Sequence, residues 1–265
     1  MPCPSATLTV WASAWLVGAV APDDVLDALS PWADAHDVQA ADQATAATTG
    51  LSAPGTPVSS VAFLLAALRR TTPRGPGRLV LPAPGDVRGL PGPGLFSRQA
   101  TAVGEGVMFA DAGLGVVPTL VADGVLRWTV YPLPGHSPPA EFVAVAQAER
   151  ELREEVRRSA SILTSLGVAR HRPGVREEIA AALRARPASL WPARMPAQSL
   201  RVLQHADEVQ AILRAALMDE PGGALSAAAA SARRAALRPI ETAVRVARKA
   251  AVTEAVRVLA ASPLV

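Results

Sequence analysis

Cysteine, lysine and aromatic residues are all scarce in this sequence. Cys3 is the only cysteine and Lys249 the only lysine among 265 residues, and aromatic side chains make up 4% of the chain. A single cysteine excludes an internal disulfide, a thiolate zinc site and an iron–sulfur centre, and it favours a reducing cytoplasm. Because the only lysine lies far from any glycine cluster, a Walker A nucleotide loop is also excluded.

Half of the residues are hydrophobic, so the chain is long and apolar enough to build a sizeable core. With so few aromatics, we expect that core to consist mainly of Ala, Val and Leu. The net charge is +3, and all the basic side chains that contribute to it except Lys249 are arginines. A genome rich in G and C produces the same excess of Ala, Arg, Gly and Pro, so this charge alone does not indicate a nucleic-acid partner.

The first apolar segment, from Leu8 to Ala21, has to be tested as a signal peptide or membrane anchor. No Lys or Arg precedes it, and as a helix it would span about 21 Å, short of the roughly 30 Å of a bilayer core. Leu8, Trp11 and Trp15 recur at helical spacing. We therefore expect a buried first helix and no membrane association.

The convincing β-strand signals are confined to the middle of the chain. Four short runs, rich in Val and bounded by turn residues, are Arg78 to Pro82, Gly106 to Ala110, Gly115 to Ala122 and Val125 to Pro132. Asp123-Gly124 predicts a two-residue hairpin, and Pro118 predicts an edge position or a bulge. The polar stretch from Asp34 to Pro57 is typical of a surface loop or a loosely packed helix.

After the loop from His136 to Pro139 the pattern becomes helical. Ser137 and Pro138 are suited to start a long helix whose apolar seam begins at Phe142 and which ends at Gly167. Further helices are predicted over 174–186, 197–218 and 225–261, the last interrupted at Pro239. The fold class is therefore α+β: N-terminal helices with a small, partly antiparallel four-stranded sheet, followed by a C-terminal antiparallel helical bundle. Two domains, 1–135 and 136–265, or one continuous domain, fit this pattern.

One glycine-rich passage, from Pro82 to Arg98, could hold an anion. It leaves a predicted strand and enters a predicted helix at Leu95, where free N–H groups and the helix dipole favour negative charge. The candidate ligand-binding residues are Arg88, Gly92, Gly94, Ser97 and Arg98, with Asp86 or Glu105 as the nearest candidates for an acid or base. Four prolines in the passage lack a donor N–H, so a rigid structural connector is the favoured alternative.

Other motifs of chemistry are incomplete. No complete GxGxxG motif for dinucleotide binding is present, and no GxSxG motif of a serine hydrolase follows a predicted strand. Asp34, His36, Asp37 and Asp42 form the nearest approach to a metal set, but an exposed polar segment accounts for them better. We therefore assign no catalytic residue, no metal ligand and no cofactor.

Basic side chains recur near the C-terminus. On a helical wheel, five of them fall within about a third of the circumference: Arg234, Arg238, Arg245, Arg248 and Lys249. This Arg stripe could meet phosphates or an acidic partner. Because Glu241 interrupts it and no aromatic is interleaved for base stacking, the solvated outer face of a bundle helix is the favoured interpretation.

Three passages, LVLPAPGDVRGLPGP, DAGLGVVPTLV with LRWTVYPL, and SARRAALRPIETA, resemble an uncharacterised family of actinobacterial proteins from about residue 55 to the end. The resemblance implies an actinobacterial, cytoplasmic protein. It brings no activity, cofactor or catalytic residue that could be transferred.

We predict a non-enzymatic binding or interaction protein, acting on a protein partner or a small anionic ligand. The alternative is an enzyme or sensor that binds an anionic metabolite at the 82–98 loop. A nucleic-acid-associated protein using the Arg stripe is a third and less favoured hypothesis. Packing against a second copy of the chain, as a homo-oligomer, stays open because an Ala- and Leu-rich seam serves either arrangement.

Overall fold

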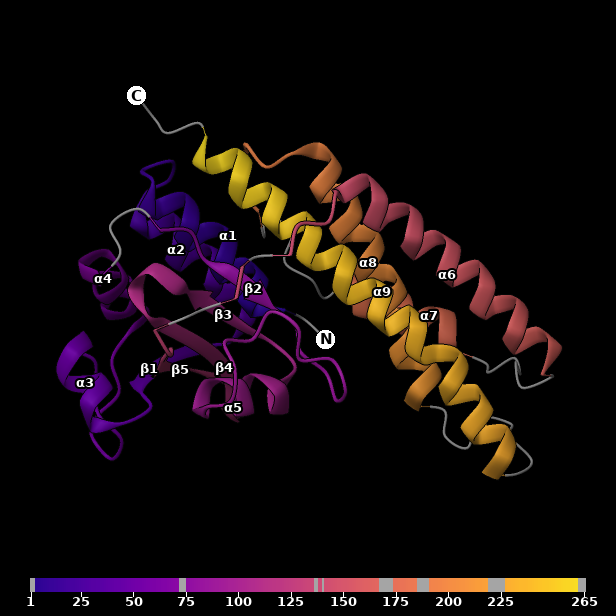
Figure 1. Cartoon of the computed structure of the whole chain (residues 1–265), viewed down its shortest axis with the longest axis horizontal. Coiled ribbons are helices and arrows are strands. Elements are labelled where there is room, and N and C mark those ends of the chain that lie inside the picture. Colours follow the sequence, from indigo (N-terminus) through magenta and orange to yellow (C-terminus); the bar gives the residue numbers. More distant parts are fainter. Residues whose placement is uncertain are drawn as a thin grey trace. The chain divides into compact units, whose positions relative to one another are not determined.

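The computed structural model describes residues 3–71, 75–135, 138–139, 141–166, 174–184, 191–218 and 227–261 (Figure 1). The chain divides into two compact units. The first contains residues 2–141, 189–195 and 252–265, and the second contains residues 142–188 and 196–251. The α+β class predicted from the sequence is confirmed.

The first unit is built around one five-stranded sheet in the order β1-β5-β4-β3-β2. Its strands are β1 (Ala35–Ala40), β2 (Arg78–Val80), β3 (Gly106–Phe109), β4 (Leu114–Ala122) and β5 (Val125–Pro132). The β1–β5 pair is parallel, and the other pairs are antiparallel. The four predicted strands are present, and Asp123-Gly124 makes the predicted turn between β4 and β5.

The prediction of four strands is wrong by one, because β1 lies within the segment expected to be a loop or helix. β1 contains one β-branched residue, Val38, and pairs with a strand 90 positions further along the chain, Ala35 opposite Val125. The strand β1 is therefore not predicted by the β-propensity of its residues, and its pairing partner is not a neighbouring segment of the sequence. The short helix α3 (Gln43–Thr49) follows, with the Asp42 carboxylate accepting the Thr45 N–H at its start.

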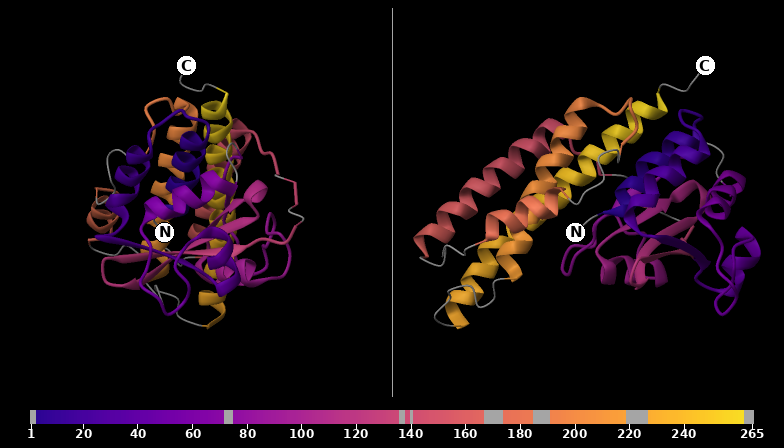
Figure 2. Two further views of the ribbon diagram at one scale, coloured as in Figure 1. Left: turned by 90° about the vertical axis from the view of Figure 1, so that its left-hand side faces the viewer. Right: turned by 180° about the vertical axis from the view of Figure 1, so that it is seen from behind.

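Helices cover both faces of the sheet (Figures 1 and 2). Side chains on alternate positions of β3 to β5 form two separate cores. One core joins the sheet to α1 (Pro4–Leu16), α2 (Pro22–Leu29) and α4 (Val61–Thr71), and the other joins it to α5 (Leu95–Val103). Two single-turn helices, η1 (Ser30–Trp32) and η2 (Ala110–Ala112), complete the unit. The first apolar segment is thus a buried helix, as expected.

Pro118 lies inside β4 without breaking the sheet. β3 pairs with β4 only as far as Val116, so Pro118 falls where β4 has no neighbour on that side. The irregularity in the β4–β5 ladder lies further on, between Leu120 and Ala122. The missing N–H of the proline is therefore placed at a local edge, as strand chemistry requires.

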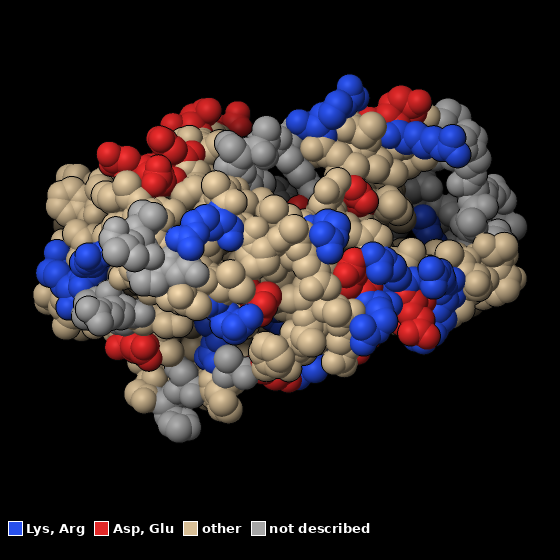
Figure 3. All heavy atoms as spheres, turned by 90° about the horizontal axis from the view of Figure 1, so that it is seen from above, with Lys and Arg blue, Asp and Glu red and all other residues tan. Residues whose placement is uncertain are grey.

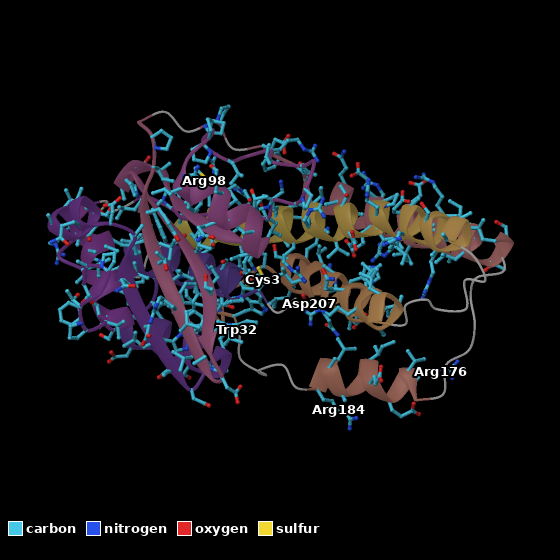
Figure 4. The ribbon with its side chains drawn as sticks, turned by 90° about the horizontal axis from the view of Figure 1, so that it is seen from below. Cys3, Trp32, Arg98, Arg176, Arg184 and Asp207 are labelled. Carbon is cyan, nitrogen blue, oxygen red and sulfur yellow. The ribbon has the colours of Figure 1, made fainter. Side chains whose placement is uncertain are left out.

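The second unit consists of helices that surround α8 (Ala197–Met218). Both α6 (Val145–Ser165) and α7 (Val175–Arg184) pack against α8. The long helix α9 (Ala227–Ala260), of which residues up to 251 belong to this unit, is tied to α8 by two arginines: Arg233 donates to the Ala216 carbonyl oxygen, and Arg248 pairs with Asp207. Figure 4 labels Asp207 on α8 and marks α7 by Arg176 and Arg184.

Two helix predictions need correction. The long helix starts at Val145 rather than at Pro138, and Phe142, expected in its buried seam, is 70% exposed; Ser137 and Gly167, its predicted cap residues, lie outside the described residues. The predicted interruption at Pro239 is absent, since α9 runs through it. Leu237, Ile240 and Val244 are buried around this position, so packing holds the helix together despite the lost backbone hydrogen bond. Among the described residues, no helix has the length and apolarity needed to span a bilayer.

Candidate functional site

The predicted anion loop is shaped by contacts within itself. Arg88 donates from Nε to Asp86 Oδ1 at 2.8 Å and from Nη2 to Asp86 Oδ2 at 3.2 Å, and Ser97 Oγ donates to the Gly92 carbonyl oxygen at 2.5 Å. The Asp86 carboxylate raises the pKa of Arg88 through its hydrogen bonds and charge. One of the two arginines expected to clamp an anion is thus already bound to a carboxylate.

The start of α5 is the part of this loop whose backbone N–H groups donate to no side-chain cap. Gly94 begins this helix without a side-chain hydrogen bond to its first turn, and Arg98 is exposed one turn further on (Figure 4). Gly92 and Gly94 are both exposed, and a Cβ built on either would meet no atom within 4 Å. The backbone of Gly92 and Gly94 and the Arg98 side chain are therefore accessible here, whereas Phe96 and Ser97 in the first turn are buried.

Of the two carboxylates proposed as acid or base, only Asp86 lies at this loop. Glu105 is 7% exposed, and its Oε2 accepts the Ser5 N–H of α1 at 2.9 Å. A carboxylate at the first turn of a helix is favoured by the helix dipole. Glu105 therefore stabilises the start of α1, whereas Asp86 stays beside Arg88.

Asp34, His36, Asp37 and Asp42, the nearest approach to a metal set in the sequence, do not form one cluster. His36 Nδ1 accepts the Trp128 indole N–H at 3.1 Å, Asp37 pairs with Arg127 at 3.2 Å, and Asp42 caps α3. Burial lowers the pKa of His36, partly offset by the nearby Leu29 carbonyl. Across the part of the chain that the structure describes, no three His, Cys, Asp or Glu side chains gather as a metal site.

The Arg stripe does not form one exposed surface. Arg248 is 5% exposed and binds Asp207 of α8, whereas Arg234 and Arg238 are exposed. Basic and acidic side chains are interleaved on the face shown in Figure 3. Phosphate binding needs an accessible, predominantly basic surface, and this helix supplies only part of one.

The second unit contains a groove that the sequence patterns did not reveal. It lies between α6 and α9, encloses about 500 Å³, and we call it the α6–α9 groove. From α6 it is lined by Ala148, Glu151, Glu154, Glu155 and Arg158, and from α9 by Arg238, Pro239, Thr242, Ala243 and Val246. Ala148 is buried and Ala243 and Val246 are half-buried, so an apolar floor lies between charged rims.

Local spacing places the α6 rim residues on one face. Ala148, Glu151, Glu155 and Arg158 follow one another at intervals of three, four and three, which is the period of an α-helix. A spacing of four residues along α6 predicts exposed ion pairs of Glu149 with Arg153 and of Glu154 with Arg158. The first is present, but Arg158 pairs with Glu155 instead, at 2.6 Å. The α6 period was thus readable, but the facing wall from α9, about 90 positions away, was not.

Comparisons with known proteins agree in pointing to one family. The family model described as "Rv1486c-like protein, N-terminal domain" matches residues 5–143, and "Rv1486c-like protein, C-terminal domain" matches residues 146–249. Uncharacterized protein Rv1486c of Mycobacterium tuberculosis is 40% identical, over 95% of this chain and 96% of its own length. Uncharacterized protein ML1804 of Mycobacterium leprae is 34% identical, over 94% and 96%. No solved structure matches the chain. The resemblance to an actinobacterial family is confirmed and covers nearly the whole chain.

Proposed function

We propose that this chain, which belongs to the family of Rv1486c-like proteins, is a non-enzymatic interaction protein that binds another protein through the α6–α9 groove. The observation that carries the proposal is the groove's construction, an apolar floor between a charged α6 wall and an α9 wall that carries Arg238. Protein interfaces share this plan of an apolar centre and a polar rim, and grooves between helices commonly receive an amphipathic helix.

The charged groups of the groove suit binding rather than chemistry. Glu151 accepts a hydrogen bond from Gln147 Nε2 at 2.8 Å, and Glu155, whose side chain is 14% exposed, is held by Arg158 and Ser159, so both carboxylates already have partners within α6. Binding of a partner is a use that carboxylates and arginines on a groove wall can serve without acting as an acid or base. The proposal includes the cytoplasmic location favoured by the single cysteine.

Filling the groove tests this function. Ala243 is half-buried on the floor, and an arginine there would place bulk and charge in the groove without entering the core. We expect the full chain to capture a protein from a lysate of the native host and Ala243→Arg to lose it. Ala160→Arg, an exposed position on α6 outside the groove, is the matched control and should keep the partner. Equal capture by the two variants would contradict the proposal.

A second candidate is an anion site at the 82–98 loop, favoured by the uncapped, exposed start of α5. Arg98 with the N–H groups of the first turn would bind a carboxylate or phosphate, and Arg88 would contribute on leaving Asp86. In a thermal-shift screen of anionic metabolites, a ligand at a hundredfold its dissociation constant stabilises the fold by about 2.7 kcal/mol. We expect Arg98→Ala to abolish that shift and Arg201→Ala, an exposed arginine of α8, to keep it. A shift that survives in Arg98→Ala removes this candidate.

A further inference from the structure

The floor of the α6–α9 groove is made of short side chains. Ala148 of α6 is buried, and Ala243 and Val246 of α9 are half-buried. Because these side chains are short, the two helices leave about 500 Å³ of open volume between them. Large aliphatic side chains of a binding partner would fill this volume and remove the apolar floor from water, which is the main driving force of protein association.

Charges are segregated along the groove. Glu151 and Glu154 precede Arg158 on α6. Because α6 and α9 run in opposite directions (Figure 1), Arg238 of α9 lies toward the Arg158 end of the groove. The groove therefore has an acidic end, nearer to Ala148, and a basic end.

Three of the exposed charges have no counter-charge within the described part of the chain. Glu155 and Arg158 pair with each other. Glu151, Glu154 and Arg238 are exposed, and no ion pair of any of them with another described residue is found. A binding partner therefore meets two unpaired anions at one end of the groove and one unpaired cation at the other, and it is favoured when it supplies the opposite charges.

Aliphatic surface continues the groove past its basic end. Ile162 follows Arg158 by four residues on the same face of α6, and Leu166 follows by four more. Their exposed fractions are 40% and 43%. From Ala148 to Leu166 this face is about 27 Å long, at a rise of 1.5 Å per residue. A small metabolite does not reach over that length, whereas a helix of about 18 residues does.

A helix has the convex shape that a groove between two helices receives, because its side chains give it a diameter of about 10–12 Å. We propose that the α6–α9 groove binds one amphipathic helix of about 18 residues from a different protein. The apolar face of this helix lies on the floor, and its basic side chains meet Glu151 and Glu154. An acidic side chain about one to two turns away meets Arg238, so the charges fix the direction in which the helix lies. The inference rests on the proposed function and names the chemistry of its partner.

A displayed peptide library tests the charge preference of the groove. The probes are 18-residue peptides with leucine at every third or fourth position and Lys, Glu, Gln or Ser at the others. Selection on the full chain should enrich lysine beside the leucine face, with glutamate about one to two turns away. Selection on the double variant Glu151→Lys with Glu154→Lys should enrich glutamate in place of that lysine.

Fluorescence anisotropy of one enriched peptide, synthesised with a fluorophore, measures the effect. The double variant should raise the dissociation constant by about tenfold or more. The same peptide with its lysines replaced by glutamate should bind the double variant more tightly than it binds the parent chain. Asp27→Lys with Asp111→Lys makes the same change in net charge at exposed positions of the first unit. This matched control should bind the enriched peptide like the parent chain.

Two further measurements test the shape of the ligand and the integrity of the variants. A proline at the centre of the enriched peptide prevents a continuous helix, so this peptide should lose binding. Far-ultraviolet circular dichroism verifies that each variant of the chain keeps its helix content.

The helix proposal is overturned if no peptide is enriched, if lysine is not preferred, or if the central proline leaves binding unchanged. Equal dissociation constants for the double variant and its control also overturn it. The wider proposal fails separately. If any of these results is obtained while Ala243→Arg loses a protein captured from the lysate, the groove binds proteins and its ligand is not a basic amphipathic helix. If Ala243→Arg changes neither peptide binding nor capture, both proposals fail.

Discussion

Single residues decide how closely α5 approaches the sheet. Gly115 of β4 lies under the Phe96 ring, and a Cβ at this position would overlap the ring atoms. Phe96 is almost fully buried, so it has no free space into which to retreat. We expect Gly115→Ala to lower the free energy of unfolding by about 1–3 kcal/mol, the range for overpacked cores.

Urea unfolding with Gly135→Ala as the control checks this prediction. Gly135 is exposed, its φ lies outside the left-handed region, and a Cβ there would meet nothing within 4 Å, so its replacement should change the unfolding free energy by no more than about 0.5 kcal/mol. Equal effects of the two substitutions would mean that Phe96 moves aside.

His36 links the stability of the sheet to pH. Its Nδ1 accepts the Trp128 N–H, and its pKa lies below the ordinary value because of burial. The unfolded chain therefore binds a proton more readily than the folded one, with an unfolded pKa of about 6.5. This part of the stability is fully present above pH of about 6.5 and is lost as the pH falls through the lower, folded pKa.

Thermal melts across this pH range measure the effect. The melting temperature of the parent chain should fall as the pH drops below about 6.5. In His36→Gln, which does not titrate there, the corresponding part of the fall should be absent. Parallel pH profiles of the two proteins would show that His36 is not the responsible group.

At the scale of elements, α8 and α9 are joined by an ion pair that is largely removed from water. The Arg248 side chain is 6% exposed and lies 2.5 Å from Asp207, whereas Arg257 pairs with Glu254 on the surface with 62% exposure. Removing one partner of a buried pair leaves an uncompensated charge and costs about 3–5 kcal/mol, against about 0–1 kcal/mol for a surface pair. Arg248→Ala should thus reduce the unfolding free energy far more than Arg257→Ala. Similar losses in chemical denaturation would contradict this assignment.

Pro239 is the other feature of α9 with a measurable cost. A proline inside a helix is less favourable than alanine by about 3 kcal/mol, because it lacks an N–H and clashes with the preceding turn. Pro239 is exposed, so its replacement leaves no cavity. We expect Pro239→Ala to stabilise the protein by up to about 3 kcal/mol in urea unfolding. Pro22→Ala, at the first position of α2, should give no such gain.

The same elements show what the sequence could disclose. The helix at 95–103, the hairpin at 123–124 and α8 are local signals, and they are predicted closely. β1 and the continuity of α9 through Pro239 depend on distant partners and on packing, so local rules failed there. For the candidate sites, the charges of α6 and α9 were recognised separately. They meet in one groove because α6 and α9 pack side by side, and residue spacing along a single helix gives no information about that packing.

At the scale of the whole molecule, sequence segments and compact units do not coincide. The first unit includes residues 252–265, beyond the end of the second family match at residue 249. Val252, Ala255 and Leu259 are buried side chains of that segment. We expect a fragment of residues 1–143 to unfold at a lower temperature than the first unit does in the full chain. Addition of a peptide of residues 252–265 should raise the melting temperature of the fragment, and a fragment as stable as the full chain would contradict this.

The pairing of β1 with β5 also has a consequence during synthesis. Ala35 meets Val125 across the sheet, so the edge strand cannot pair until 90 further residues have left the ribosome. At 5–20 residues per second, translation of that stretch takes roughly 5–20 s. For most of this interval the apolar face of α1 has no sheet to cover it, because the strands that contact it, β2, β3 and β4, are completed only between Arg78 and Ala122. The nascent chain therefore passes through a long, aggregation-prone stage in which a chaperone that shields its first helix would raise the yield of folded protein.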